Sequence, residues 1–183
     1  MEDELIERIE PLLIDGYQNL VKISIPHDPH HLFHAICRAF FKPYIDQEFN
    51  GSKILRLQIV LNLRRELADK LSQVIPNQKV RYYDLYRHES MSMLQMQSQL
   101  ASNDAITFGY FKYLSHQINK DIFILDENGH RYTCSELTPR GRTAIVLYYH
   151  DNHFDLVGLK VDDLIQTHFR PTHDLIQRLV STI

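Results

Sequence analysis

Two apolar runs joined by a short polar connection limit this chain to folds that contain a β-sheet. Residues 144–149 read AIVLYY, residues 154–159 read FDLVGL, and His-Asp-Asn-His lies between them. Runs of β-branched and aromatic residues on both sides of a tight polar turn are typical of adjacent antiparallel strands. The sequence therefore predicts a sheet near the C-terminal end, which helices must cover on its apolar faces.

The middle of the chain carries helical patterns. Residues 53–75 place apolar side chains mostly three or four positions apart and end at Pro76, which stops a helix. The other expected helices cover an N-terminal stretch to about residue 14 and residues 31–41, 82–100, 106–118, 161–169 and 174–180. The other expected strands cover residues 21–25, 121–125 and 131–134. This order predicts an α+β fold with a three-layer α/β/α arrangement.

Composition excludes several classes of protein. With 183 residues the chain is long enough for one domain with a substantial core. Its net charge of −3 gives it no overall attraction to nucleic acid or to an anionic membrane. No run approaches the roughly 18 apolar residues of a membrane span, and the acidic N-terminus does not resemble a signal peptide. Two cysteines, Cys37 and Cys134, make no disulfide framework, so we expect a cytoplasmic protein.

Histidine is unusually frequent around one predicted helix start. Four of the 11 histidines lie within residues 27–34, which read HDPHHLFH and lead from a polar turn into the helix expected over 31–41. The first N–H groups of a helix have no partner within the helix and favour an anion or a thiolate. This turn is therefore a candidate site for a nucleophile or an oxyanion.

A second candidate lies in the predicted hairpin. His153 and Asp155 are two residues apart on a strand, so their side chains share one face of the sheet. An acid in that position can orient an imidazole, as the acid of a catalytic triad does. By spacing alone, however, such pairs are more often ordinary surface residues.

Together the two segments resemble the two ends of the ovarian-tumour (OTU) family of deubiquitinating cysteine proteases. That family carries a motif of the form Asp-Gly-x-Cys-Leu-Phe with a small residue two positions later, and residues 28–35 here read DPHHLFHA. It closes with an apolar strand, a turn and His-Tyr-Asp or a relative. Here the strand 145–149 and a turn precede HFD at 153–155, and the two motifs are about 120 residues apart. The stretch FFKPY adds a similarity to OTU-like proteins of large DNA viruses.

The resemblance implies both a fold and a set of roles. It covers roughly residues 21–159 of a single domain, 1–183, with N- and C-terminal helical extensions. The implied fold is the papain-like α+β fold of OTU cysteine proteases, a small, mostly antiparallel sheet flanked by helices. Asp28 then matches the acid of the oxyanion loop, His153 the general base and Asp155 the acid that orients it.

The chain departs from the family at its nucleophile. His31 stands where the family has cysteine, and Pro29 stands where it has glycine. Proline has no N–H, so Pro29 removes one potential oxyanion donor. Cys37 lies six residues beyond His31, about 240° around the helix, and does not reach the same site. We expect Cys37 and Cys134 to be structural, and the candidate catalytic residues Asp28, His31, His153 and Asp155 to form an inactive site.

The histidine cluster allows other interpretations. His31, His34 and His153 are candidate zinc ligands, but their spacing matches no familiar zinc pattern, so we predict no metal and no cofactor. The simpler alternative is that His30 and His34 are solvated while His31 fills the vacated slot. At a helix N-terminus His31 should be neutral and share a hydrogen bond with His153. Arg64 belongs to a small basic pair that we expect on a solvated face.

The sequence thus favours a pseudo-deubiquitinase that binds ubiquitin, a ubiquitin-like protein or another protein, and that contacts neither nucleic acid nor membrane. One alternative is an active isopeptidase that works through His31 or a histidine-bound metal. Another is a structural virion or scaffold protein that reuses the fold. If the protein is viral, the host-cell cytoplasm or the virion is its expected location.

Overall fold

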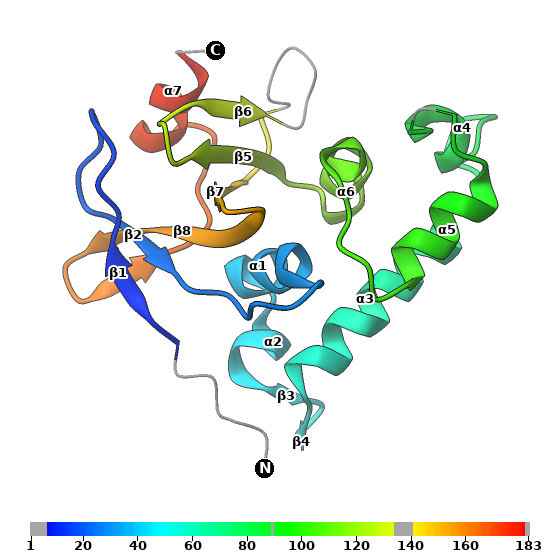
Figure 1. Ribbon diagram of the computed structural model, residues 1–183, viewed down its shortest axis with the longest axis horizontal. Helices are drawn as coiled ribbons and strands as arrows, with labels where there is room; N and C mark the ends of the chain where they lie inside the picture. Colours follow the sequence, from blue (N-terminus) through cyan, green and yellow to red (C-terminus); the bar gives the residue numbers. More distant parts are fainter. Residues whose placement is uncertain (1–6, 89, 134–140, 182–183) are drawn as a thin grey trace.

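The computed structural model describes residues 7–88, 90–133 and 141–181, and its centre is a mixed β-sheet (Figure 1). The strands follow the order β1-β2-β8-β7-β5-β6, and β9 pairs with the far end of β8. Only β5 and β7 run parallel among the described pairs, so the predicted, mostly antiparallel sheet is confirmed. The strands are β1 (Ile9–Pro11), β2 (Leu20–Ile23), β5 (Asp121–Asp126), β6 (Arg131–Thr133), β7 (Ala144–His150), β8 (His153–Val161) and β9 (Leu164–Gln166).

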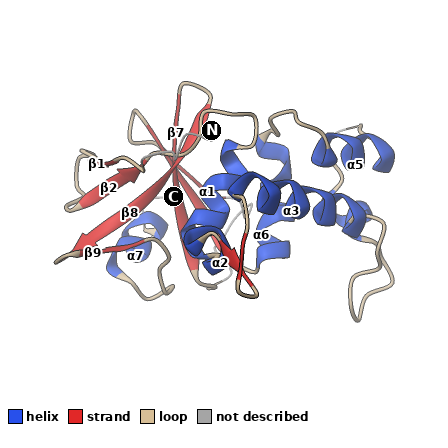
Figure 2. Ribbon diagram, turned by 90° about the horizontal axis from the view of Figure 1, so that it is seen from below, coloured by secondary structure: helices blue, strands red, loops and turns tan. Residues whose placement is uncertain are grey.

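Helices cover both faces of this sheet. The helices are α1 (His31–Phe40), α2 (Lys42–Asp46), α3 (Arg56–Lys70), α4 (Tyr82–Tyr86), α5 (Met93–Ala101), the 3-10 turn η1 (Phe108–Tyr110), α6 (Phe111–Ile118) and α7 (Asp174–Val180). Figure 1 shows α7 on one side of the strands and α1 on the other. In Figure 2, α3 and α5 lie side by side and extend away from the sheet. A separate small hairpin, β3 (Glu48–Phe49) and β4 (Ser52–Lys53), precedes α3.

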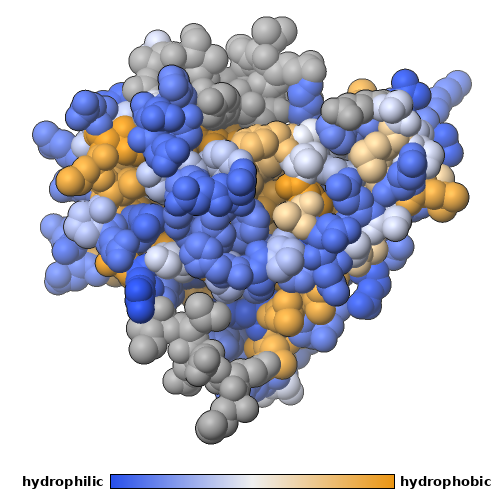
Figure 3. Space-filling view, viewed as in Figure 1, coloured by the Kyte–Doolittle hydropathy of each residue, from blue (hydrophilic) through white to orange (hydrophobic). Residues whose placement is uncertain are grey.

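The central strands bury both of their faces, and alternate residues belong to two cores. Ile122 and Ile124 of β5 pack in the core shared with α1, α3 and α6, whereas Phe123 and Leu125 pack against α7. Because successive strand residues point to opposite faces, both faces must be apolar for this arrangement. The three-layer α+β architecture predicted from the sequence is therefore confirmed. Polar side chains cover most of the face that Figure 3 shows, with smaller apolar areas between them.

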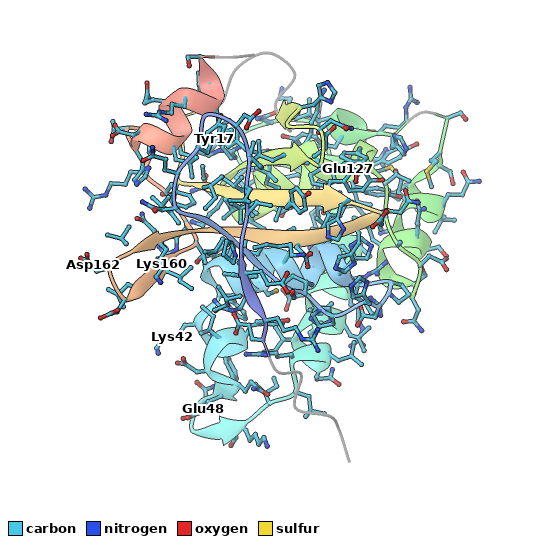
Figure 4. The ribbon with its side chains drawn as sticks, turned by 60° about the vertical axis from the view of Figure 1, so that its left-hand side comes forward. Tyr17, Lys42, Glu48, Glu127, Lys160 and Asp162 are labelled. Carbon is cyan, nitrogen blue, oxygen red and sulfur yellow. The ribbon has the colours of Figure 1, made fainter. Side chains whose placement is uncertain are left out.

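Two predicted helices are wrong. In the described part of the N-terminal stretch, Ile9–Pro11 is a strand that pairs with β2, an edge position where the missing N–H of proline is tolerated. In the segment 161–169, Asp162 turns the chain with a φ of 53° and folds β9 back on β8. Figure 4 shows Lys160 and Asp162 at the tip of this hairpin.

Other predicted helices exist with different limits. The helix expected over 53–75 begins only at Arg56, because residues 52–53 form β4, and ends at Lys70. The helix expected over 82–100 is broken into α4 and α5, and a capping box between Ser92 and Gln95 starts the second. Within the described ranges, no helix combines the length and the apolar character needed to cross a lipid bilayer.

Candidate functional site

The start of α1 lies against the beginning of β8, so the two segments singled out in the sequence meet. β2 leads through residues 24–30 into α1, and the Asp28 side chain shapes this connection by accepting the N–H of His30 at 2.7 Å. The ring centroids of His31 and His153 are 4.8 Å apart. Asp28, His31, His153 and Asp155 therefore lie in one region, although the catalytic roles of these residues stay a prediction.

Asp155 is the centre of the hydrogen-bond network on β8. Its Oδ1 accepts the backbone N–H of Ile25 at 2.8 Å and lies 3.2 Å from Nε2 of His153. Its Oδ2 lies 2.7 Å from Nε2 of His150. Burial alone would raise the pKa of Asp155, but the hydrogen bonds from His153, His150 and Ile25 together lower it to about 2. The carboxylate of Asp155 is therefore ionised at neutral pH and accepts a hydrogen bond from each of these three groups.

This network defines the tautomer of His153. Because an ionised Asp155 can only accept, Nε2 of His153 carries the proton, and a neutral ring has its lone pair on Nδ1. His27 stacks on one side of the ring at a centroid distance of 4.0 Å, and His31 packs next to it. His153 is consequently 4% exposed, an oriented base that is covered by other imidazoles.

His31 is also buried, and one of its nitrogens is already in use. Its Nδ1 accepts the backbone N–H of Phe154 at 3.0 Å, rather than the predicted hydrogen bond with His153. The remaining nitrogen, Nε2, carries the proton of the neutral ring. Burial, and then the neighbouring His153, lower the pKa of His31 to about 4, so the ring is neutral near pH 7, as predicted.

The turn before α1 offers few donors to an oxyanion. Pro29 has no N–H, the N–H of His30 donates to the Asp28 carboxylate, and the N–H of His31 lies 3.2 Å from the Asp28 carbonyl oxygen. An oxyanion hole needs donors that aim at the developing charge rather than at the protein itself. In this conformation the three positions after Asp28 supply none.

His30 and His34 are buried, so the alternative in which both are solvated is wrong. Nδ1 of His30 accepts from Nη1 of Arg64 at 2.8 Å. His34 lies between the hydroxyl of Tyr44, 2.7 Å from Nδ1, and the Asp28 carboxylate, 3.2 Å from Nε2. Both histidines therefore have polar partners that replace water.

Sequence reasoning missed Arg64 and His150. Arg64 is only 1% exposed and lies in α3, not on the solvated face that was expected. His150 ends β7, directly opposite His153 in the strand register. The tight connection of the hairpin was a signal for this pairing, whereas nothing local marks Arg64 as buried.

A groove of about 1020 Å³ opens beside the Asp28 turn, on the side of α2 and the start of α3. His34, Tyr44 and Arg56 lie along it with Asp28. His31 and His153 are not among its described lining residues, so the groove leads to the base of the turn and not to the imidazole pair.

The described residues contain no group of three or more His, Cys, Asp or Glu side chains that is arranged to hold a metal ion. The candidate ligands His31 and His34 point to different partners, Phe154 and Tyr44. Their three-residue spacing thus does not bring them, together with His153, to a common ion.

We expect Cys37 to be unreactive in the folded protein. It lies on α1 and is buried in the hydrophobic core. Burial raises the pKa of its thiol to about 12, so almost no thiolate forms near neutral pH. Alkylation with iodoacetamide, followed by peptide mass spectrometry, should leave Cys37 unmodified until denaturant is added. Labelling of Cys37 in native buffer at the rate of a free thiol would contradict this. Cys134 lies outside the described residues.

Comparison with known proteins identifies the fold. No protein-family model and no curated sequence matches the chain. An ovarian tumor (OTU) domain solved in complex with ubiquitin matches with a TM-score of 0.59 and 16% identity over 92% of this chain and 86% of that one. The OTU domain of OTUD1 matches with a TM-score of 0.55 and 17% identity over 76% and 85%. The Hazara virus OTU bound to ubiquitin, at a TM-score of 0.47, 17% identity and coverage of 78% and 82%, is too distant to support a viral origin.

Proposed function

We propose that this chain, whose fold is that of OTU domains, is a catalytically impaired member of that fold that acts as a protein-binding module. The observation that carries the proposal is the hydrogen bond from the N–H of Phe154 to Nδ1 of His31. The lone pair of Nδ1 is engaged in this bond and Nε2 of the neutral ring bears a proton, so neither nitrogen has a free lone pair for attack on a carbonyl carbon. The residue at the nucleophile position therefore fills the site rather than reacting in it.

Two further features support the loss of activity. The N–H groups after Asp28 are missing or used within the turn, which removes donors that a tetrahedral intermediate requires. The nearest described thiol, Cys37, is buried and protonated, so it offers no alternative nucleophile.

Ubiquitin is the first partner to test. One solved structure with this fold is an OTU domain in complex with ubiquitin. A module that has lost the chemistry but kept the fold can retain a binding surface, because binding depends on the exterior and not on the nucleophile. Ubiquitin-like proteins and unrelated proteins are the alternative partners of the same module.

The test is a reaction with ubiquitin that carries a C-terminal electrophile, followed by titration calorimetry with mono- and di-ubiquitin. We expect no covalent adduct at any residue and measurable heat of binding with at least one form of ubiquitin. Rapid labelling, or hydrolysis of ubiquitin chains that disappears in His31→Ala or with a chelator, would establish the active alternative instead. Self-association in light scattering, without any affinity for ubiquitin, would favour a structural protein.

A further inference from the structure

Two successive histidines attach the first turn of α1 to two different parts of the molecule. His30 accepts from the guanidinium of Arg64 in α3, with 2.8 Å between Nδ1 and Nη1. His31 accepts from the backbone N–H of Phe154 in β8, with 3.0 Å between Nδ1 and N. A guanidinium and a backbone N–H can only donate, so each Nδ1 must be unprotonated for these bonds to exist.

Protonation of either ring would remove its bond. A doubly protonated imidazole directs an N–H at another N–H, and the positive end of the α1 dipole opposes the added charge. Arg64 beside His30, and His153 and His27 beside His31, disfavour a positive charge as well. Two carboxylates act in the opposite direction, Asp28 on both rings and Asp155 on His31, but burial has the largest effect on each ring.

The neighbouring His34 provides a contrast within the same helix. Its partners are the hydroxyl of Tyr44 and the carboxylate of Asp28, and both can accept a hydrogen bond from a ring N–H. A protonated His34 can therefore keep both contacts. Burial also lowers the pKa of His34, against the opposing effect of Asp28, so the folded protein disfavours its protonation as well. Protonation of His34 breaks neither contact, however, whereas protonation of His30 or His31 removes the bond that holds the turn.

We propose that His30 and His31 form an acid-sensitive latch, which in mildly acidic solution releases the first turn of α1 from α3 and β8 and uncovers His153. The latch is independent of ubiquitin binding, because it depends only on contacts within the chain. Above the ordinary pKa of histidine both bonds are intact. As the pH falls below that value, protons favour the released form.

The size of the effect follows from the pKa of His31. That pKa is lowered to about 4 in the closed form, against 6.5 for a free ring. A lowered pKa means that the released form binds more protons, so closure weakens as the pH falls from about 6.5 to about 4. At pH 5 this linkage shifts the equilibrium toward release by about 30-fold for His31 alone. Burial, and then Arg64, lower the pKa of His30 in the same direction.

The experiment is amide hydrogen exchange of the full chain, measured by NMR at about pH 7 and about pH 5 and corrected for intrinsic exchange rates. In the wild type we expect the protection of the Phe154 amide and of the first turn of α1 to fall by about 20-fold or more between these two pH values. In the double variant His30→Asn, His31→Asn, the side-chain Oδ1 can accept the same two bonds without titrating. Its protection should change by less than about threefold.

A matched control uses the histidine that caps α7. His173 accepts the backbone N–H of Leu175 at 3.1 Å, and asparagine is also a good N-cap, so His173→Asn should keep the wild-type fall in the protection of Phe154. Protection that does not change with pH in the wild type would overturn the proposal. Protection that falls as much in the double variant as in the wild type would overturn it as well. If the double variant does not fold, the pH titration of the His30 and His31 ring resonances in the wild type provides the test instead. Titration midpoints below 6.5 that coincide with the shift of the Phe154 amide support the latch, and ordinary midpoints refute it.

Discussion

The double variant Pro29→Gly, His31→Cys should cleave a ubiquitin C-terminal conjugate, whereas His31→Cys alone should cleave it weakly at best. Asp155 already orients His153 with a lone pair available on Nδ1, so a thiol at position 31 would lie beside a prepared base. Loss of a nucleophile costs on the order of 10⁶-fold in a hydrolase triad, and loss of one oxyanion donor about 10²–10³-fold. We therefore expect the double variant to exceed the single variant by about 100-fold or more.

The measurement is release of a fluorophore from the ubiquitin C-terminus, with the variant Pro29→Gly, His31→Ala as the control that has the same loop but no thiol. Replacing His153 with alanine in the active double variant should abolish the gain. Strong cleavage by His31→Cys alone would show that Pro29 does not impair the donor loop. A folded double variant that binds ubiquitin but does not cleave would mean that the relation of position 31 to His153 is unsuitable for catalysis.

The elements that sequence reasoning predicted well are those with strong, local patterns. The strands β7 and β8 are runs of apolar, β-branched and aromatic residues, and α1 carries a helical pattern, so each segment indicates its own conformation. Short segments were predicted less well, because pairing with a neighbour decides them. The residues of β1 and β9 become strands through β2 and β8, which no local pattern reveals.

The candidate site divides in the same way. The proximity of His153 and Asp155 follows from two-residue spacing on a strand, and the structure places Nε2 of His153 3.2 Å from Oδ1 of Asp155. The environments of His30 and Arg64 depend on partners more than 30 residues away, so composition and spacing favoured solvated side chains. A buried charge is rare and needs a complete set of partners, and those partners exist only in the folded chain.

Arg64→Ala should destabilise the protein strongly, because Arg64 satisfies four acceptors from one buried position. Its Nε donates to the Leu100 carbonyl at 2.7 Å, and its Nη2 donates to the carbonyls of Gln99 and Asp104 at 3.0 and 2.7 Å. The fourth acceptor is Nδ1 of His30. Removing these donors leaves two buried acceptors, the Leu100 carbonyl and Nδ1 of His30, and two part-buried carbonyls without partners. We expect a loss of about 3–5 kcal/mol in the free energy of unfolding.

Urea denaturation followed by circular dichroism measures this loss, and the adjacent residue gives a matched control. Arg65 is exposed on the same helix, so Arg65→Ala should change the free energy of unfolding by no more than about 0.5 kcal/mol. Arg64→Lys keeps the charge but not the planar fork, and should fall between the two because one ammonium cannot reach all four acceptors. The side chain also packs over Phe33, 4.8 Å from the ring centroid. Arg64→Met keeps much of this apolar contact, so a Met variant as stable as the wild type would show that packing, rather than hydrogen bonding, makes Arg64 important.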